Sequence, residues 1–267
     1  MLLFEEIAYG PIHSRRLGVS LGMNIMPLHN KLCTFDCVYC ELGFNKEVRN
    51  PLLPNREEIA EALEVKLSQL LRDGIKLDVI TFSGNGEPML HPDVENIICD
   101  TCRLRDKYFP TAKVSVLSNS TQLMRDDVRR ALMQADNRIL KLDSAVTSTM
   151  RLIDQPVNKE LTTEQIISKL LLFGGNFTLQ TCFLRGDVLL PNPWREGSYT
   201  LGHLDNTTDE ELQAWYAAVE KLRPTEIMIY VIDRQTPVST LEKISPAEMN
   251  AIAAPLIEKG FSVVVSC

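Results

Sequence analysis

Short apolar runs alternate with amphipathic stretches along most of this chain of 267 residues. The stretch that follows Asn55, a favoured N-cap residue, shows the pattern clearly. Its apolar residues Ile59, Leu63 and Leu67 recur every four residues, which is the spacing of one face of a helix. Residues 77–82 are then a short and largely apolar run, typical of a buried strand. The pattern predicts a helix followed by a strand.

The same order of helix and strand recurs to the end of the chain. The predicted strands are residues 17–25, 77–82, 113–117, 138–142, 177–184, 226–232 and 261–265. The predicted helices between them are residues 55–73, 92–107, 125–133, 163–173, 208–223 and 245–259. Strands that alternate with helices in this way form a parallel sheet with helices outside it. The predicted fold class is therefore α/β, and six or seven such units suit an open or closed barrel.

The domain organisation follows from the same pattern. No linker divides the chain, which predicts a single domain over residues 1–267. Residues 1–17 lack clear periodicity and are predicted to be an extended lead-in. Residues 185–207 are rich in proline, glycine and asparagine, and we expect an insert loop there that contains Trp194 and Arg195. A long connection of this kind is typical of a lid or a substrate-specific loop.

Composition and charge narrow the class of protein. The chain is 45% hydrophobic and 24% charged, as in an ordinary globular enzyme. It has no apolar run of about 18 residues, so no membrane span is expected. Glu5 and Glu6 stand where a signal peptide would be basic and then apolar, which predicts a cytoplasmic protein with reduced thiols. The net charge of −7 argues against a basic, nucleic-acid-binding face.

Three cysteines lie within eight residues, in the loop after the first predicted strand. Cys33, Cys37 and Cys40 have the spacing C-x3-C-x2-C. Thiolates select zinc, Cu(I) or iron–sulfur clusters. Because iron–sulfur clusters usually have four cysteine ligands, a set of three indicates one position for an exogenous ligand. A structural zinc site with His29 as fourth ligand is the main alternative, but it lacks the paired spacing of zinc sites.

This motif, with the aromatic residue Tyr39 before its last cysteine, resembles the signature of the radical S-adenosylmethionine (SAM) superfamily. Further segments look like its "Fe-S oxidoreductase" branch, near the wyosine-type tRNA-modifying enzymes. They are residues 10–18, 82–88, 117–119, 141–143 and 229–234, so the resemblance covers nearly the whole chain. It implies a partial (β/α)6 TIM-type barrel of the radical SAM type.

The resemblance also implies a chemistry. Cys33, Cys37 and Cys40 would hold three irons of a [4Fe–4S] cluster, and SAM would bind the fourth iron. Reductive cleavage of SAM would give a 5′-deoxyadenosyl radical that abstracts hydrogen from a substrate. Such an oxidoreductase-like enzyme needs iron, SAM and an external electron donor as partners. Its substrate stays unidentified and is a small molecule, a peptide or a tRNA.

Other functions remain open at this point. One is modification of tRNA of the wyosine type, and another is activation of a second enzyme by formation of a glycyl radical. A third is a non-enzymatic iron–sulfur or zinc protein, such as an electron relay. A relay needs no SAM pocket, so the residues expected to bind SAM separate it from an enzyme.

The expected SAM contacts lie at or near the ends of predicted strands, where barrel enzymes build their sites. Glu87 offers an acceptor for the SAM amino group, and Ser118 with Asn119 suits its ribose hydroxyls. Lys141 and Asp143 share one face of a strand, where they contact SAM or form a structural ion pair. The full set of cofactor-binding residues implied is Tyr39, Asn85, Gly86, Glu87, Ser118, Asn119, Lys141 and Asp143.

Overall fold

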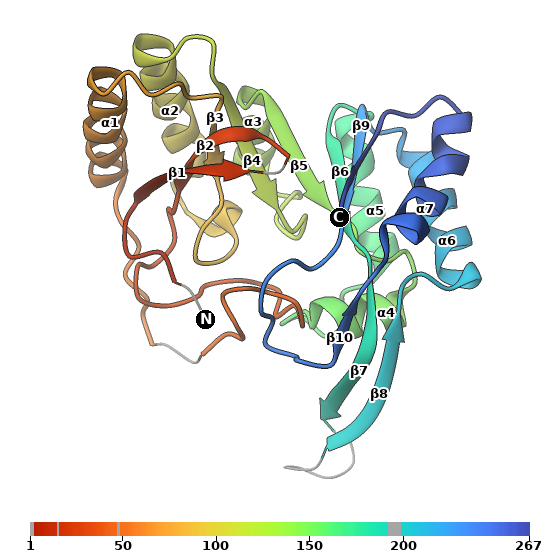
Figure 1. Ribbon diagram of the computed structural model, residues 1–267. Helices are drawn as coiled ribbons and strands as arrows, with labels where there is room; N and C mark the ends of the chain where they lie inside the picture. Colours follow the sequence, from red (N-terminus) through yellow and green to blue (C-terminus); the bar gives the residue numbers. More distant parts are fainter. Residues whose placement is uncertain (1–2, 15, 47–48, 192–198) are drawn as a thin grey trace. The chain divides into compact units, whose positions relative to one another are not determined.

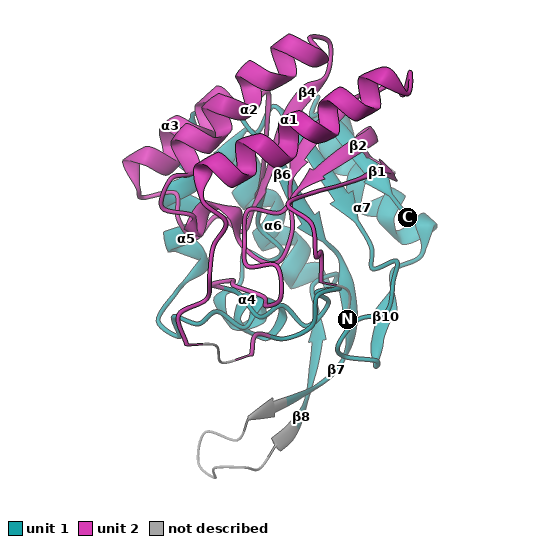
Figure 2. Cartoon of the chain, turned by 90° about the vertical axis from the view of Figure 1, so that its left-hand side faces the viewer, with its two compact units in different colours: residues 1, 35–44, 141–267 teal, residues 2–34, 45–140 magenta. Residues whose placement is uncertain are grey.

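The computed structural model describes residues 3–14, 16–46, 49–191 and 199–267. The chain divides into two compact units, drawn in different colours in Figure 2. Unit 2 comprises residues 2–34 and 45–140, and unit 1 comprises residue 1, residues 35–44 and residues 141–267. Neither unit is continuous in sequence, because residues 35–44, which contain two of the three clustered cysteines, belong to unit 1. The single domain remains a prediction.

Unit 2 is built on strands that follow one another in space as they do in sequence (Figure 1). They are β1 (Ala8–Ser14), β2 (Gly18–Met23), β3 (Val79–Phe82), β4 (Lys113–Ser118) and β5 (Asn137–Lys141), whose last residue is counted in unit 1. Strands β2 to β5 are parallel, as predicted, and β1 pairs antiparallel with β2.

Strand β1 lies within the predicted extended lead-in over residues 1–17, and the prediction did not include a strand there. Its pairing with β2 shifts register between Tyr9 and Ile12, around Gly10 and Pro11. A bulge breaks the two-residue alternation of side chains, and proline lacks the N–H that a ladder needs. The usual signature of a strand is therefore absent from this stretch of sequence.

Three helices of unit 2 lie where the sequence predicts them, and the 3-10 helix η1 was not predicted. The helices are α1 (Arg56–Arg72), the short 3-10 helix η1 (Pro88–Leu90), α2 (Val94–Tyr108) and α3 (Asp126–Gln134). At the start of α1, the Asn55 side chain accepts from Glu58 N at 2.9 Å, and Asn55 N donates to the Glu58 carboxylate at 2.7 Å. This capping box satisfies backbone donors that the first turn leaves without helical partners.

Unit 1 contains a parallel set of strands in the order β6 (Thr178–Cys182), β9 (Glu226–Tyr230) and β11 (Val263–Ser266). Its helices are α4 (Thr147–Asp154), α5 (Thr163–Leu170) with the 3-10 turn η2 (Leu171–Phe173), α6 (Asp209–Leu222) and α7 (Pro246–Glu258). All but α4 lie within predicted helices. Val146, the N-cap residue of α4, makes no side-chain capping bond, so the sequence has no start signal there.

A second, antiparallel sheet of unit 1 corrects the prediction of a loop over residues 185–207. Its order is β10 (Leu241–Lys243), β7 (Leu184–Pro191) and β8 (Tyr199–Asp205). Strands β7 and β8 form a hairpin whose register runs from Arg185–Asp205 to Pro191–Tyr199. Trp194 and Arg195, expected in a lid, lie outside the described residues.

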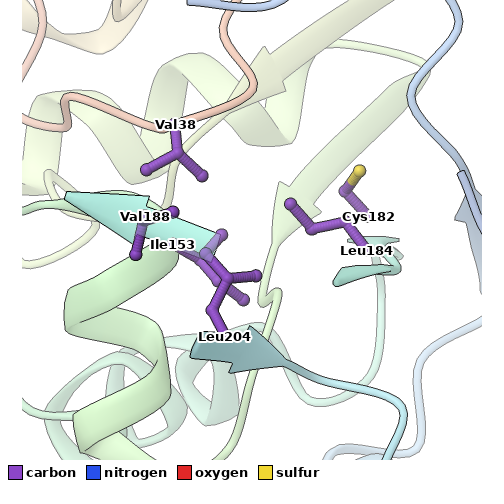
Figure 3. Close-up of a cluster of buried hydrophobic side chains, with 6 residues drawn as sticks. All are labelled: Val38, Ile153, Cys182, Leu184, Val188 and Leu204. Atoms are coloured by element: carbon purple, nitrogen blue, oxygen red, sulfur yellow. The ribbon is translucent and has the colours of Figure 1, made fainter. Parts of the chain in front are cut away.

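A cluster of buried side chains fixes this hairpin and the cysteine loop onto the same part of unit 1. Figure 3 shows Val38 of the loop beside Ile153 of α4 and residues of β6, β7 and β8. The members of the cluster are Val38, Ile153, Cys182, Leu184, Val188 and Leu204, each 1% exposed or less. Burial of this much apolar surface anchors the loop that carries Cys37 and Cys40.

Candidate functional site

The cysteine loop passes from unit 2 to unit 1 between Thr34 and Phe35. Cys33 therefore belongs to unit 2, whereas Cys37 and Cys40 belong to unit 1. All three residues are thiols of intermediate exposure. Cys40 N donates to Cys37 O at 3.1 Å, which folds the end of the motif into a turn.

The start of this segment is tied to the C-terminal end of α4. Asp36 N donates to Asp154 O at 2.8 Å, and Val38 N donates to Ile153 O at 2.9 Å. These two bonds bracket Cys37, so its backbone position is set by a helix rather than by the loop alone. Val38 is at the same time buried in the core cluster.

A buried cation lies against the Cys37 thiol. Lys141 Nζ is 3.0 Å from Cys37 Sγ and 3.0 Å from Asp143 Oδ2, and it also pairs with Asp154. Cys37 Sγ in turn donates to Asp154 Oδ1 at 3.4 Å. The side chains of Asp143 and Asp154 are 0% and 2% exposed. Two buried carboxylates thus surround one ammonium beside a proposed metal ligand.

The electrostatics of this group follow from its burial. Burial disfavours the charged form of Lys141, but the Asp143 and Asp154 carboxylates outweigh it and hold the lysine pKa well above its usual value. Burial raises the pKa of Asp154 to about 7 against the opposing effect of Lys141. Lys141 and Asp143 form the ion pair that was the alternative to SAM contact, and the SAM contact stays a prediction.

Tyr39 is held by the same group. Its hydroxyl donates to Asp143 Oδ2 at 2.5 Å, and Tyr230 OH donates to Tyr39 OH at 3.4 Å. Lys141 Nζ lies 4.9 Å from the centre of the Tyr39 ring, within cation–π range. Burial and the Asp143 charge raise the pKa of Tyr39 well above its usual value, so the phenol keeps its proton.

Asp143 is itself fixed by the end of β6. Its Oδ1 accepts from Cys182 N at 3.0 Å. Asn206 Nδ2 donates to both Asp143 O and Cys182 O at 2.8 Å. Sequence reasoning missed Asn206 and Asp154, since neither stands at the end of a predicted strand or in a recognised motif.

In unit 2 the structure brings together three of the predicted SAM-binding residues. Glu87 is buried, and its Oε1 accepts from Ser118 Oγ at 2.9 Å while its Oε2 accepts from Asn119 N at 2.7 Å. Oε1 also accepts from Met89 N at 3.0 Å, which caps η1. The ends of β3 and β4 are thus joined through one carboxylate.

Asn119 links this carboxylate to the first cysteine. Its Nδ2 lies 3.5 Å from Cys33 Sγ and donates to Thr34 Oγ1 at 2.9 Å. Asn45 Nδ2 donates to Cys33 O at 3.3 Å. The Cys33 end of the motif therefore lies beside predicted SAM-binding residues within one unit.

The Asn85 side chain makes structural contacts within unit 2, and its contact with SAM stays a prediction. It is fully buried, and its side chain accepts from Phe4 N at 2.9 Å and donates to Phe4 O at 2.8 Å and to Pro27 O at 2.9 Å. These contacts use the oxygen and both donor hydrogens of the amide. The Asn85 side chain therefore connects the chain at Phe4 with the chain at Pro27.

Gly86 supports the segment that leads into the cysteine loop. Leu32 N donates to Asn85 O at 2.8 Å, and Glu87 N donates to Leu32 O at 3.0 Å. The Gly86 backbone has φ +140°, and a Cβ at this position would lie 1.8 Å from Leu32 O. Only glycine permits this approach.

The donor set fits an iron–sulfur cluster in its chemistry. Thiols of Cys33, Cys37 and Cys40, all of intermediate exposure, are the soft ligands that such a cluster takes. Across the described residues, no group of three or more histidine, cysteine, aspartate or glutamate side chains is arranged to hold a metal ion.

Comparison with protein sequences finds relatives that this chain matches over only part of their length. No family model matches the chain. A protein named GTPase Obg of Brachyspira hyodysenteriae is 29% identical over 245 residues, which are 90% of this chain and 32% of that protein. A UPF0026 protein of Methanocaldococcus jannaschii is 35% identical over 173 residues, 64% of this chain and 50% of that protein. The chain thus spans from a third to a half of these two relatives.

Comparison with solved structures decides the fold. TYW1 with a lysine–pyruvate adduct bound has a TM-score of 0.62 at 14% identity, over 90% of this chain and 73% of that chain. SuiB of Streptococcus suis bound to S-adenosylmethionine has 0.59 at 14%, over 88% and 48%. A radical SAM methyltransferase of Sphaerobacter thermophilus has 0.59 at 12%, over 92% and 66%. This chain has the radical SAM fold.

The radical SAM fold confirms the predicted α/β class, a partial (β/α)6 barrel of the radical SAM type. The fold agrees with the resemblance drawn from the C-x3-C-x2-C motif. Identities of 12–14% establish the fold and nothing finer. Within the described part of the chain, no helix has the length and apolar character needed to cross a membrane.

Proposed function

We propose that this protein is a radical SAM enzyme in which Cys33, Cys37 and Cys40 hold a [4Fe–4S] cluster. The proposal depends on one observation, the C-x3-C-x2-C motif in a chain with the radical SAM fold. A bound cluster of this kind supplies an electron that splits SAM into methionine and a 5′-deoxyadenosyl radical, which takes a hydrogen atom from a substrate.

The chain's own residues would prepare the ligands. Lys141 lies at hydrogen-bond distance from the Cys37 sulfur and places a positive charge there. Positive charge near a thiolate stabilises its ionised form, which is the form that binds metal. Within unit 2, Asn119 contacts the Cys33 sulfur. Outer contacts of this sort orient ligands and tune the centre they hold.

Binding of SAM is assigned to a subset of the predicted residues. Glu87, Ser118 and Asn119 form one connected group that contacts Cys33, and this supports their assignment. Tyr39, Lys141 and Asp143 form another group around Cys37. At Gly86 the backbone lies close to Leu32 O, and the Asn85 side chain holds the start of the cysteine loop through Pro27 O.

The partners of the protein are also part of this proposal. The chain spans only a third to a half of the length of two sequence relatives, so the partners of the whole protein do not follow from them. We propose an external electron donor and a cytoplasmic setting in which the thiols stay reduced. The net charge of −7 disfavours a tRNA substrate, since phosphate recognition relies on basic side chains.

The test is anaerobic reconstitution with iron and sulfide, followed by dithionite and SAM. We expect 5′-deoxyadenosine as a product, and we expect Cys37→Ala to lose both the product and cluster iron. Cys99→Ala is the matched control, because Cys99 is an exposed thiol on α2 outside the motif. Zinc in place of iron in protein purified without oxygen would overturn the proposal.

A further inference from the structure

Unit 1 contains two neighbouring cavities at the cysteine loop. The larger, of about 520 Å³, lies between the loop, the β7–β8 hairpin and the segment Pro237–Thr240. The smaller, of about 400 Å³, is lined by Cys40 and Glu41. Phe44 and Pro237 line both cavities, so the two cavities are adjacent. The larger volume falls in the range of about 300–1,000 Å³ typical of small-molecule sites.

The wall of the larger cavity is apolar and partly open to solvent. Leu189 of β7 and Leu201 of β8 are partners across the hairpin, and they are 63% and 71% exposed. Phe44 of the cysteine loop is 38% exposed. Large apolar side chains that gather on an exposed cavity wall mark a binding surface. Val188, which lines the same cavity, belongs to the buried cluster of Figure 3. This part of the wall is therefore packed against the hydrophobic core of unit 1.

Among the described residues that line this cavity, those with a charged side chain are acidic. Asp36 and Asp187 line it, and no lysine or arginine is among the described residues that do. Asp187 is held in place, since His203 Nδ1 lies 2.8 Å from its Oδ1 and Thr240 Oγ1 donates to its backbone oxygen. In the smaller cavity, Glu41 is already paired with Arg234 at 2.7 Å. A ligand with a phosphate would meet repulsion here, whereas an ammonium would be attracted.

From this apolar wall with two carboxylates we propose that the larger cavity binds an organic ammonium compound with an apolar body. Its apolar part would pack on Phe44 and Leu201, and its ammonium would face Asp187 and Asp36. That this ligand is the substrate of a radical reaction beside Cys40 rests on the proposed function. The binding itself needs neither the cluster nor SAM.

The experiment measures binding to the apoprotein by calorimetry with three probes of similar shape. They are 3-phenylpropylamine, 3-phenylpropanol and 3-phenylpropionate, which are cationic, neutral and anionic at neutral pH. Half-exposed charge pairs contribute modestly, so we expect the amine to bind about 5–30-fold more tightly than the carboxylate. Asp187→Asn and Asp36→Asn should each reduce this ratio, and together they should bring it near one.

Two variants separate the roles of charge and apolar wall. Leu201→Ser should weaken all three probes alike, because it removes apolar contact and no charge. Asp209→Asn, an exposed carboxylate of unit 1 that does not line the cavity, should leave the ratio unchanged. A circular dichroism spectrum of each variant confirms that it is folded.

Equal binding of amine and carboxylate, or no binding of the amine, would overturn the proposal. Tighter binding of 3-phenylpropyl phosphate than of the amine would do so as well, since it would indicate a phosphate ligand. Failure here with 5′-deoxyadenosine still formed would leave the enzyme proposal intact. Amine binding without 5′-deoxyadenosine would support the ligand class and remove its link to radical chemistry.

Discussion

Lys141 is the cation that compensates the buried carboxylates Asp143 and Asp154 of unit 1. Its ammonium contacts Asp143, Asp154 and the Cys37 sulfur, and it lies near the rings of Tyr39 and Phe35. Neither carboxylate is more than 2% exposed, so water compensates little for a lost cation. Breaking a buried pair from one side leaves a charge without compensation.

The first residue-scale prediction is that Lys141→Met destabilises the apoprotein by about 3–5 kcal/mol, the usual result of removing one partner of a buried ion pair. Urea unfolding under reducing conditions measures it. Lys107→Met is the matched control. Lys107 pairs with Glu64 at 2.7 Å, but its side chain is 57% exposed, so we expect a much smaller loss than for Lys141→Met. Equal effects of the two changes would contradict the assigned role of Lys141.

The residues around Lys141 also show how far sequence reasoning reaches at a site. The cysteines and the pair Lys141–Asp143 could be named in advance, because motif spacing and strand alternation are local properties of the chain. Asp154 and Asn206 could not, since they reach Cys37 and Asp143 only through the packing of α4 and the chain after β8. Contacts over 60 residues or more are set by tertiary structure and leave no local pattern.

At the scale of elements, the turn after β3 determines how the cysteine loop begins. Gly86 pairs with Leu32 in an isolated parallel bridge, and Asn85 fastens the preceding segment. The glycine is necessary because its backbone lies at φ +140° with Leu32 O directly beside it. The turn thus holds the chain just before Cys33.

We predict that Gly86→Ala destabilises the protein by about 3 kcal/mol or more, because backbone strain and steric overlap add. Gly74→Ala tests strain without overlap. Gly74 follows α1 at φ +67°, and no atom lies within 4 Å of the place that an alanine Cβ would take, so about 1 kcal/mol is expected. Thermal unfolding of both variants measures the difference. A Gly86→Ala protein as stable as Gly74→Ala would refute the close approach.

Helices were predictable from sequence where apolar residues recur at helical spacing, and α2 and α3 were predicted without a side-chain cap. Helix α1 has both a capping box and an apolar face, and its predicted bounds are nearly those observed. Helix α4 has no side-chain cap, β1 has a register shift, and β7 and β8 follow one another through a stretch rich in turn-forming residues. In each of these cases the tertiary structure outweighs a weak local preference.

At the scale of the whole molecule, ion pairs and hydrogen bonds hold many carboxyl groups ionised. Their pKa values lie below the ordinary ones chiefly because of bonds from arginine, lysine or backbone groups. The lowered groups are Glu64, Asp78, Glu95, Asp100, Asp127, Asp136, Glu164 and Glu248. For Glu248, bonds from Ser245 and Arg185 lower the pKa to about 2.

Because these pKa values are lowered in the folded state, we expect the free energy of unfolding to decrease in acid. A carboxyl with a lowered pKa in the folded state stabilises the fold above its unfolded pKa, which is about 3.9 for aspartate and 4.3 for glutamate. As the pH falls below these values, the unfolded chain binds protons first. The free energy of unfolding should therefore decrease from about pH 5 downward, until the folded-state groups are protonated too.

Asp136 is the group through which this prediction is best tested. Burial opposes its ionisation, but bonds from Val114 N at 2.8 Å and from Arg105 at 2.6 Å outweigh burial and lower its pKa. Asp136→Asn should reduce the slope of unfolding free energy against pH between about pH 5 and pH 2, since one linked proton is removed. Arg105→Gln should reduce the slope as well, because it takes away a charged donor. Urea unfolding at several pH values measures the slopes, and an unchanged slope in Asp136→Asn would mean that this carboxyl titrates alike in both states.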